Sequence, residues 1–291
     1  MTSGEEPLRL PGEASLPVRY DSADGVAVVT LNRPERGNAW TGRMEAEYRR
    51  ALTRAETDPD VAVVIITGAG RHFCVGADTR ALDRISGTGV YDDGVRAPLA
   101  QPAPHPDPDL GGRHSFLWAM SKPVIAAVNG AAAGIGFVIA CYADLRFATE
   151  GAKFTTATAR LGLPVEFGLS WLLPRLVGIG RAAELTFGSP VISAEEAERM
   201  GLVNLVIPGE SLLPETLDYA RRMARECAPS SLRAAKAQLY TDLRGTLAAS
   251  EADYFRRLDE MTGGPDFAEG VAALVGRRAP NFRAIDPARP T

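Results

Sequence analysis

Residues 122–148 read KPVIAAVNGAAAGIGFVIACYADLRFA, and this stretch decides the fold. A run rich in β-branched and small apolar residues over 123–129 is followed by the glycines of 130–136 and by an apolar segment that ends at Tyr142. The part from 123 to 143 carries no charge and is about as long as a membrane span. Its glycines, alanines and Asn129 make it too weakly hydrophobic for that role. We therefore predict a strand, a turn and a buried helix.

Similar patterns flank this stretch on both sides. Short β-branched runs occupy 26–32 and 61–68, and the apolar residues between them, over 41–57, have helical spacing. Two further short strands are expected at 145–148 and 153–155. Continuous apolar strands that alternate with helices indicate a layered α/β core whose sheet is buried on both faces.

The second half of the chain is predicted to be mostly helical. Ser193 and Glu196 have the spacing of a capping box, and a strand is expected over 202–207. Helical patterns follow at 214–226, 230–243, 246–262 and 266–277. We accordingly divide the chain into three parts, a disordered leader (1–17), an α/β core (18–210) and a C-terminal helical region (211–291). A Pro- and Gly-rich segment within the core, 96–112, has the composition of a lid loop.

The composition argues against several classes of partner. The 291 residues include 32 Lys and Arg against 36 Asp and Glu, a formal net charge of −4, and no basic stripe indicates a nucleic-acid or membrane partner. Three widely spaced cysteines without a CxxC pair predict neither a metal site nor a disulfide framework. The N-terminus lacks the basic and then apolar order of a secretory signal. We therefore expect a cytoplasmic protein.

The glycine turn at 129–136 permits two interpretations. Alone it matches the turn of a dinucleotide-binding dehydrogenase, but at least two strands precede it and no tyrosine is followed by lysine four residues later. The remaining reading is a strand-to-helix turn that exposes backbone N–H groups at the positive end of a helix. A second such turn lies at 71–78. The two turns either converge as an oxyanion hole or are only tight connections.

Several segments together resemble the crotonase (enoyl-CoA hydratase/isomerase) superfamily. They cover about residues 18–283 in the family's order, and they are specific for the fold rather than for the reaction. The matching segments are LNRPERGNA (31–39), FCVGAD (73–78), KPVIAAVNG (122–130), ADLRFA (143–148), PRLVG (174–178), AEEA (194–197) with GLVN (201–204), and DFAEG (266–270).

The resemblance implies a fold, a ligand and an assembly. It implies a crotonase-type α/β spiral of ββα turns with a C-terminal helical region used for trimerisation, as a homotrimer or a dimer of trimers. The ligand would be an acyl-CoA thioester, with coenzyme A arriving as part of the substrate and no permanently bound cofactor or metal. The oxyanion hole would use the backbone N–H groups of Ala77 and Ile135. The coenzyme would lie against six residues in the matching turns, namely Arg36, Asn38, Ala39, Val75, Gly76 and Gly134.

The acids mark a departure from the family pattern. A typical hydratase of the family carries two glutamates, and the matching positions here are Val138 and Thr158. Glu166, in the segment GLPVEFGLSW, instead resembles the single acid of the family's double-bond isomerases. One carboxylate suffices to move a proton between two carbons beside a thioester enolate. Phe167 and Trp171 would raise its pKa by excluding water. Without the resemblance, Glu166 reads as a carboxylate at a helix start.

Double-bond isomerisation of an enoyl-CoA is therefore the expected reaction. The alternatives are an enoyl-CoA hydratase, a C–C hydrolase or lyase of the same superfamily, and a non-catalytic protein that binds acyl-CoA or a protein partner. The chain has three histidines: His72 lies just before the segment 73–78, His105 within the lid segment 96–112, and His114 just after that lid segment. A single histidine is more often a packed or surface residue than a catalytic one. Asp78 is expected to cap the helix that follows Ala77.

Overall fold

The computed structural model describes residues 16–90, 94–95, 98–105, 107 and 109–282, so most of the expected leader lies outside the described residues. Its main sheet has six strands in the order β1-β2-β3-β4-β6-β9, and only β1 runs antiparallel to its neighbour. The strands are β1 (Val18–Ala23), β2 (Val26–Leu31), β3 (Val63–Gly68), β4 (Val124–Val128), β6 (Leu145–Thr149) and β9 (Leu205–Ile207). A second sheet, in the order β5-β7-β8, joins Ala131–Ala133, Lys153–Thr155 and Ile192–Ser193.

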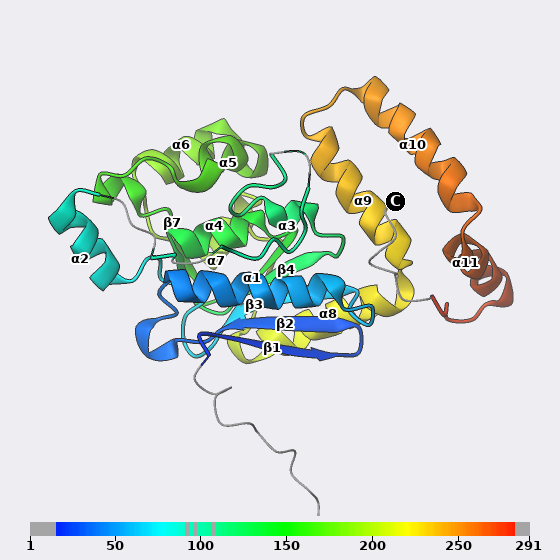
Figure 1. Cartoon of the computed structure of the whole chain (residues 1–291), viewed down its shortest axis with the longest axis horizontal. Coiled ribbons are helices and arrows are strands. Elements are labelled where there is room, and N and C mark those ends of the chain that lie inside the picture. Colours follow the sequence, from blue (N-terminus) through cyan, green and yellow to red (C-terminus); the bar gives the residue numbers. More distant parts are fainter. Residues whose placement is uncertain (1–15, 91–93, 96–97, 106, 108, 283–291) are drawn as a thin grey trace, which may run out of the picture.

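The main sheet is covered on both faces, as the continuous apolar strands predict. Along β3, Val63 and Ile65 belong to an apolar cluster with Leu212 and Ala220 of α8 (Leu212–Glu226). The residues between them point the other way, so Val64 and Ile66 join the larger core with α1 (Gly42–Thr57) and α4 (Ile135–Tyr142). Figure 1 shows α1 and α8 on either side of the strands.

The remaining helices surround this core. They are α2 (Thr79–Thr88), α3 (Phe116–Ala119), α5 (Leu169–Val177), α6 (Ile179–Phe187) and α7 (Ala194–Arg199), with short 3₁₀ turns at Pro34–Arg36, Thr158–Leu161, Glu166–Gly168 and Gly209–Ser211. The capping box that begins α7 is confirmed, since Ser193 Oγ accepts from the Glu196 N–H and the Glu196 carboxylate accepts from the Ser193 N–H. No helix in the described part of the chain is long and apolar enough to cross a membrane.

The C-terminal helices are confirmed and extend away from the core. They are α9 (Pro229–Asp242), α10 (Leu247–Thr262) and α11 (Pro265–Gly276), and in Figure 1 α10 and α11 project beyond α9. No residue of α10 is buried, and its large apolar or aromatic side chains Leu247, Tyr254 and Phe255 are exposed. On α11, Leu274 and Val275 are more than three-quarters exposed. These two helices thus present an apolar surface without a covering layer in one chain.

Two local predictions were wrong or incomplete. Between the β4 strand and the α4 helix the chain forms the extra strand β5 rather than a simple turn, because Ala131–Ala133 pair with Lys153–Thr155. The expected strand over 202–207 is reduced to β9, since the amides of Leu202 and Val203 donate to the Ala197 carbonyl and close α7. Both differences arise from hydrogen bonds to other segments.

The described residues of the segment 96–112 contain no helix or strand, and α1 holds them in place. Buried Arg49 donates to the Ala100 carbonyl at 3.1 Å and to the Arg113 carbonyl at 2.7 Å. The Arg113 guanidinium in turn pairs with buried Glu45. On the other side, Arg244, which lies just after α9, pairs with Asp107 and Asp109. Buried Arg49 and Glu45 on one side, and the exposed pairs of Arg244 on the other, therefore anchor this segment and the residues that follow it.

Candidate active site

Two segments that are far apart in the sequence pair in parallel and build one wall of the site. Residues 37–40 follow the 3₁₀ turn Pro34–Arg36, and residues 75–78 precede α2. Val75 donates to the Gly37 carbonyl at 3.1 Å, Trp40 to that of Gly76 at 2.7 Å, and Asp78 to that of Trp40 at 3.1 Å. This pairing uses the carbonyl of Gly76 and the amide of Asp78, and leaves the Ala77 N–H for another acceptor.

Asn38 stabilises this wall through three side-chain hydrogen bonds. Its side-chain oxygen accepts from the Arg33 N–H at 2.8 Å, and its amide group donates to the carbonyls of Ala69 and His72 at 3.0 and 2.7 Å. Asn38 is fully buried and has a φ of 56°, a left-handed conformation that asparagine tolerates. The residue thus joins the turn after β2 to the turn after β3.

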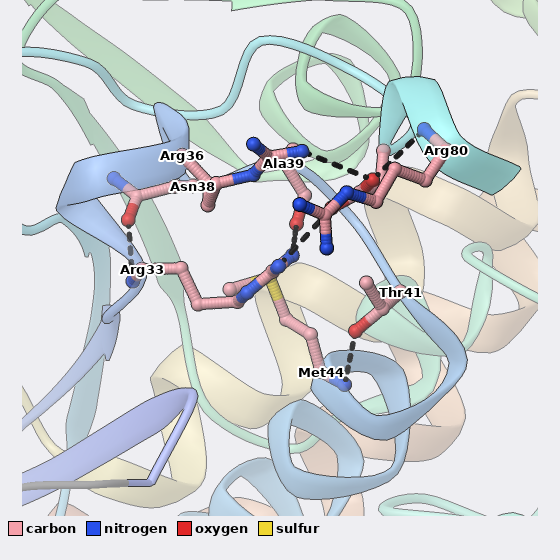
Figure 2. A network of polar contacts seen from close by, with 8 residues as sticks. Arg33, Arg36, Asn38, Ala39, Thr41, Met44 and Arg80 are labelled. Carbon is pink, nitrogen blue, oxygen red and sulfur yellow. Dashed lines mark hydrogen bonds and ion pairs between the residues drawn. The ribbon is translucent and has the colours of Figure 1, made fainter. Parts of the chain in front are cut away.

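Asp78 connects two arginines to the start of α2. Figure 2 labels its three partners, Arg33, Arg36 and Arg80. Its carboxylate lies 3.1 Å from Arg33 and 3.5 Å from Arg36, and accepts from the Arg80 N–H as the expected helix cap. Burial alone would raise the pKa of Asp78, but the hydrogen bonds from Arg80 and Arg33 outweigh it and lower the pKa. Arg33 also donates to the Ala39 carbonyl at 2.5 Å. Arg36 is the more exposed of the two guanidiniums.

The glycine turn before α4 lies directly against this wall. Cys74 donates to the Ala131 carbonyl at 3.0 Å, and Ala133 donates to the Cys74 carbonyl at 2.9 Å. A methyl group added to Gly134 would lie 3.7 Å from the Gly76 Cα and 3.5 Å from Oε2 of Glu166. The segments around Gly76, Gly134 and Glu166, all expected from the sequence to belong to the site, therefore meet at one point.

Two backbone amides are available at this meeting point. Ile135 is the first residue of α4, where an N–H group has no acceptor within the helix, and Ala77 lies in the facing turn. Gly134 has φ 49° and ψ −119°, a conformation restricted almost entirely to glycine. The positive end of the α4 dipole adds a favourable potential for a negatively charged oxygen.

Glu166 faces this point from a strained loop. Its Oε2 atom is buried and has no hydrogen-bond partner within the described part of the chain. Burial raises the pKa of the Glu166 carboxyl. The next two residues have positive φ values, 43° at Phe167 and 77° at Gly168, and Tyr142 at the end of α4 donates to the Phe167 carbonyl at 2.7 Å. Such strain persists where surrounding contacts impose it, and it is frequent at functional sites.

The structure places no carboxylate at the two positions that match the acids of the hydratases. Val138 is completely buried in α4, and Thr158 is buried in the 3₁₀ turn Thr158–Leu161. Among the described residues, no group of three or more His, Cys, Asp or Glu side chains is arranged to hold a metal ion.

The three histidines occupy different environments. His105 lies on the exposed segment before α3, while the His72 carbonyl supports Asn38. His114 is buried, and its ring meets that of Phe167 edge-on with centroids 4.8 Å apart. Burial, with the nearby Arg113 and Arg49, lowers the pKa of His114 to about 3, so the ring is neutral at pH 7.

Sequence reasoning missed Arg33, Trp40 and Tyr142 as parts of this site. Arg33 lies within a segment already singled out, but its role follows only from the contact with Asp78. Trp40 and Tyr142 are aromatic residues with no sequence pattern that marks them as part of a site. Their contacts arise only when segments far apart in the sequence come together.

Comparison with known proteins decides the family. The sequence profile described as "Enoyl-CoA hydratase/isomerase" matches residues 21–284. This chain is a member of the enoyl-CoA hydratase/isomerase family. The expected crotonase-type α/β fold is thereby confirmed, and the chain is an enzyme of a family that acts on acyl-CoA thioesters.

Relatives of the family carry both hydratase and isomerase names. The chain is 35% identical to a probable enoyl-CoA hydratase of Rhodobacter capsulatus over 91% of this chain and 97% of that protein. It is 34% identical to 1,2-epoxyphenylacetyl-CoA isomerase of Escherichia coli, over 89% of this chain and 95% of that protein. A crystal structure of a probable enoyl-CoA hydratase/isomerase from Mycobacterium abscessus superposes with a TM-score of 0.80 at 32% identity, covering 92% of this chain and 99% of that one.

Proposed function

We propose that this enzyme moves the double bond of an enoyl-CoA, with Glu166 as its single proton carrier. The observation that carries the proposal is the convergence of Glu166 Oε2 with Gly134 and Gly76, beside the amides of Ile135 and Ala77. The absence of a carboxylate at Val138 and Thr158 supports one acid rather than two.

In the proposed reaction, the thioester oxygen accepts hydrogen bonds from Ala77 N–H and Ile135 N–H. The Glu166 carboxylate takes a proton from C2 of a 3-enoyl-CoA, and the electrons of the broken C–H bond pass to the thioester oxygen as an enolate. When the enolate collapses, the double bond moves from C3–C4 to C2–C3, and C4 takes the proton from Glu166. Each backbone donor aimed at such an oxyanion contributes about 3–4 kcal/mol. The raised pKa of Glu166 suits both halves of the transfer.

Hydration is the second candidate, because a relative 35% identical to this chain carries the name of a probable enoyl-CoA hydratase. Addition of water needs a base for the water and an acid for the carbon. A lone Glu166 would have to serve both, whereas proton transfer between two carbons uses one carboxylate in turn as base and acid.

We propose that coenzyme A binds against residues 36–39 and 75–76, which overlap the wall described above. Arg36 has the more exposed of the two guanidiniums beside Asp78, so it can turn toward a phosphate without uncovering a buried charge. Gly37 and Val75 pack closely, since a methyl group on Gly37 would lie 3.0 Å from a Val75 methyl carbon. Asn38 and Ala39 border the same turn.

The apolar surface of α10 and α11 supports the predicted homotrimer or dimer of trimers. Exposed Leu247, Phe255, Leu274 and Val275 form an apolar surface of the kind that protein interfaces cover. The mass of the purified protein by light scattering would distinguish a trimer or hexamer from a monomer.

Product analysis tests the reaction. The enzyme is given 3-hexenoyl-CoA, and the product is followed by mass and by the absorbance of the conjugated thioester. We expect the 2-enoyl isomer with no change in mass, and a loss of about 10²–10⁴-fold in Glu166→Gln. Glu150→Gln, an exposed and matched change, should retain the wild-type rate. A product heavier by one water as the primary product, or an unaffected Glu166→Gln, would overturn the proposal.

A further inference from the structure

A cavity of about 360 Å³ lies between the loop after Glu166, the end of α4 and the residues that precede α3. Phe167 and Gly168, which directly follow Glu166, form one wall, and Tyr142 at the end of α4 forms another. The cavity therefore adjoins the loop that carries Glu166 and the C-terminal end of α4, opposite to Ile135.

Aromatic rings dominate the walls of this cavity. Trp118 lies 5.0 Å from Tyr142 and 6.0 Å from Trp171, measured between ring centroids, and Phe167 closes the side next to Glu166. Aromatic rings contact one another best in offset or edge-on arrangements, and the flat faces and edges of these side chains offer both to a planar guest. A cavity of roughly 150 Å³ already holds benzene, so the available volume accommodates a substituted ring.

His114 also lines the cavity and gives its wall a polar element. The side chain is 3% exposed, and neither Nδ1 nor Nε2 has a hydrogen-bond partner within the described part of the chain. A buried donor or acceptor left unpaired costs about 1–3 kcal/mol, so the site favours a ligand that pairs with it. The neutral imidazole has one N–H donor and one lone-pair nitrogen, and a hydroxyl group can pair with either.

The charges around the cavity argue against an anionic substituent. Both cations of the lining are already paired with carboxylates, Arg113 with Glu45 and Arg244 with Asp107 and Asp109. A neutral hydroxyl requires no further cation, whereas a carboxylate on the ring would be buried without one.

We propose that this cavity accepts an aryl acyl group and that His114 selects for a hydroxyl on its ring. The inference rests on the proposed function, since it places the acyl group of the same thioester. His114 is a specificity-determining residue in this account, and it takes no part in the proton transfer. The E. coli relative named above also acts, by its name, on a phenylacetyl-CoA derivative.

Calorimetric titration with unreactive thioesters tests this specificity on the full chain. The ligands are 4-hydroxyphenylacetyl-CoA, 3-hydroxyphenylacetyl-CoA, phenylacetyl-CoA and hexanoyl-CoA. We expect one hydroxylated ligand to bind at least tenfold more tightly than phenylacetyl-CoA, and phenylacetyl-CoA more tightly than hexanoyl-CoA. In His114→Phe the preference for the hydroxyl should vanish, while His105→Gln, a histidine outside the cavity, should keep it.

Each other outcome has a defined meaning. Equal binding of the hydroxylated and plain ring ligands overturns the role of His114, and tighter binding of hexanoyl-CoA overturns the aryl pocket. If His114→Phe does not fold, His114→Leu provides the comparison, and full retention of the hydroxyl preference in that variant would contradict the proposal. Turnover of 3-hexenoyl-CoA, measured in parallel, separates these results from a failure of the proposed function, which would appear as no turnover of any enoyl-CoA.

Discussion

Tyr142 donates a 2.7 Å hydrogen bond to the carbonyl of Phe167, the residue directly after Glu166. The bond joins the end of α4 to a loop whose φ of 43° at Phe167 is costly for a side chain with a Cβ. A methyl group on Gly168 would lie 2.9 Å from the same hydroxyl, so the loop and the tyrosine are packed without spare room. The position of the Glu166 carboxylate therefore depends on Tyr142, whose hydrogen bond goes to the neighbouring backbone and not to the carboxylate.

Tyr142→Phe should lower kcat by about tenfold with a smaller change in KM, because the loop that carries Glu166 loses its hydrogen bond while the coenzyme wall is untouched. Stability should fall by about 1 kcal/mol, the usual contribution of one hydrogen bond. Steady-state kinetics and urea unfolding measure the two effects. Tyr219→Phe, on α8 at the other face of the main sheet, is the control and should change neither. A kcat equal to that of the wild type would contradict the positioning role.

Gly134→Ala should damage both the fold and the activity. The backbone at φ 49° and ψ −119° disfavours any residue with a Cβ at a cost of about 1–3 kcal/mol, and the new methyl would lie 3.5 Å from Glu166 Oε2. We expect kcat/KM to fall by about 10²-fold. Gly151→Ala, where a methyl group meets nothing within 4 Å, is the matched control. Wild-type kinetics in a folded Gly134→Ala would show that this turn does not position the reacting groups.

The pH profile should show the raised pKa of Glu166. The carboxylate form takes the proton, so kcat/KM should fall as the pH drops through the pKa of this group. Because burial raises that pKa, the midpoint should lie above the ordinary glutamate value. Phe167→Ala admits water and should shift the midpoint down. A wild-type midpoint at or below the ordinary glutamate value would contradict the desolvated site.

Asp78→Ala removes the cap of α2 and the shared partner of Arg33 and Arg36. Loss of such a cap costs about 0.5–2 kcal/mol, and the two guanidiniums are left to repel each other. We expect KM for acyl-CoA to rise by about tenfold as the wall of residues 36–39 and 75–76 loosens, with kcat less affected. Kinetics and thermal unfolding measure this, with exposed Asp83→Ala on the same helix as control. An unchanged KM would remove Asp78 from the binding wall.

Regular elements were predictable because local patterns specify them. The β-branched runs of β2, β3 and β4, and the capping box at Ser193, need only a few neighbouring residues. The strand β5 was not predictable, because three alanines become a strand only by pairing with β7. The divisions at 18–210 and 211–291 remain predictions.

The site was predictable in part. The resemblance singled out Ala77, Ile135 and Glu166, and the structure brings their segments together. The left-handed Phe167, the Tyr142 hydrogen bond and the unpartnered ring of His114 depend on contacts between residues far apart in the sequence. No local pattern carries that information.

The most direct test of a single-acid isomerase follows the proton itself. The enzyme is given 3-hexenoyl-CoA that carries two deuterons at C2, and the product is examined by mass and by the position of the label. We predict a 2-enoyl product that retains one deuteron at C2 and contains no added water, with a slower kcat than for the unlabelled substrate when proton transfer limits the rate. In Glu166→Gln this product should form about 10²–10⁴-fold more slowly. A product heavier by one water as the primary product, or a Glu166→Gln variant that forms the 2-enoyl product at the wild-type rate, would contradict the account.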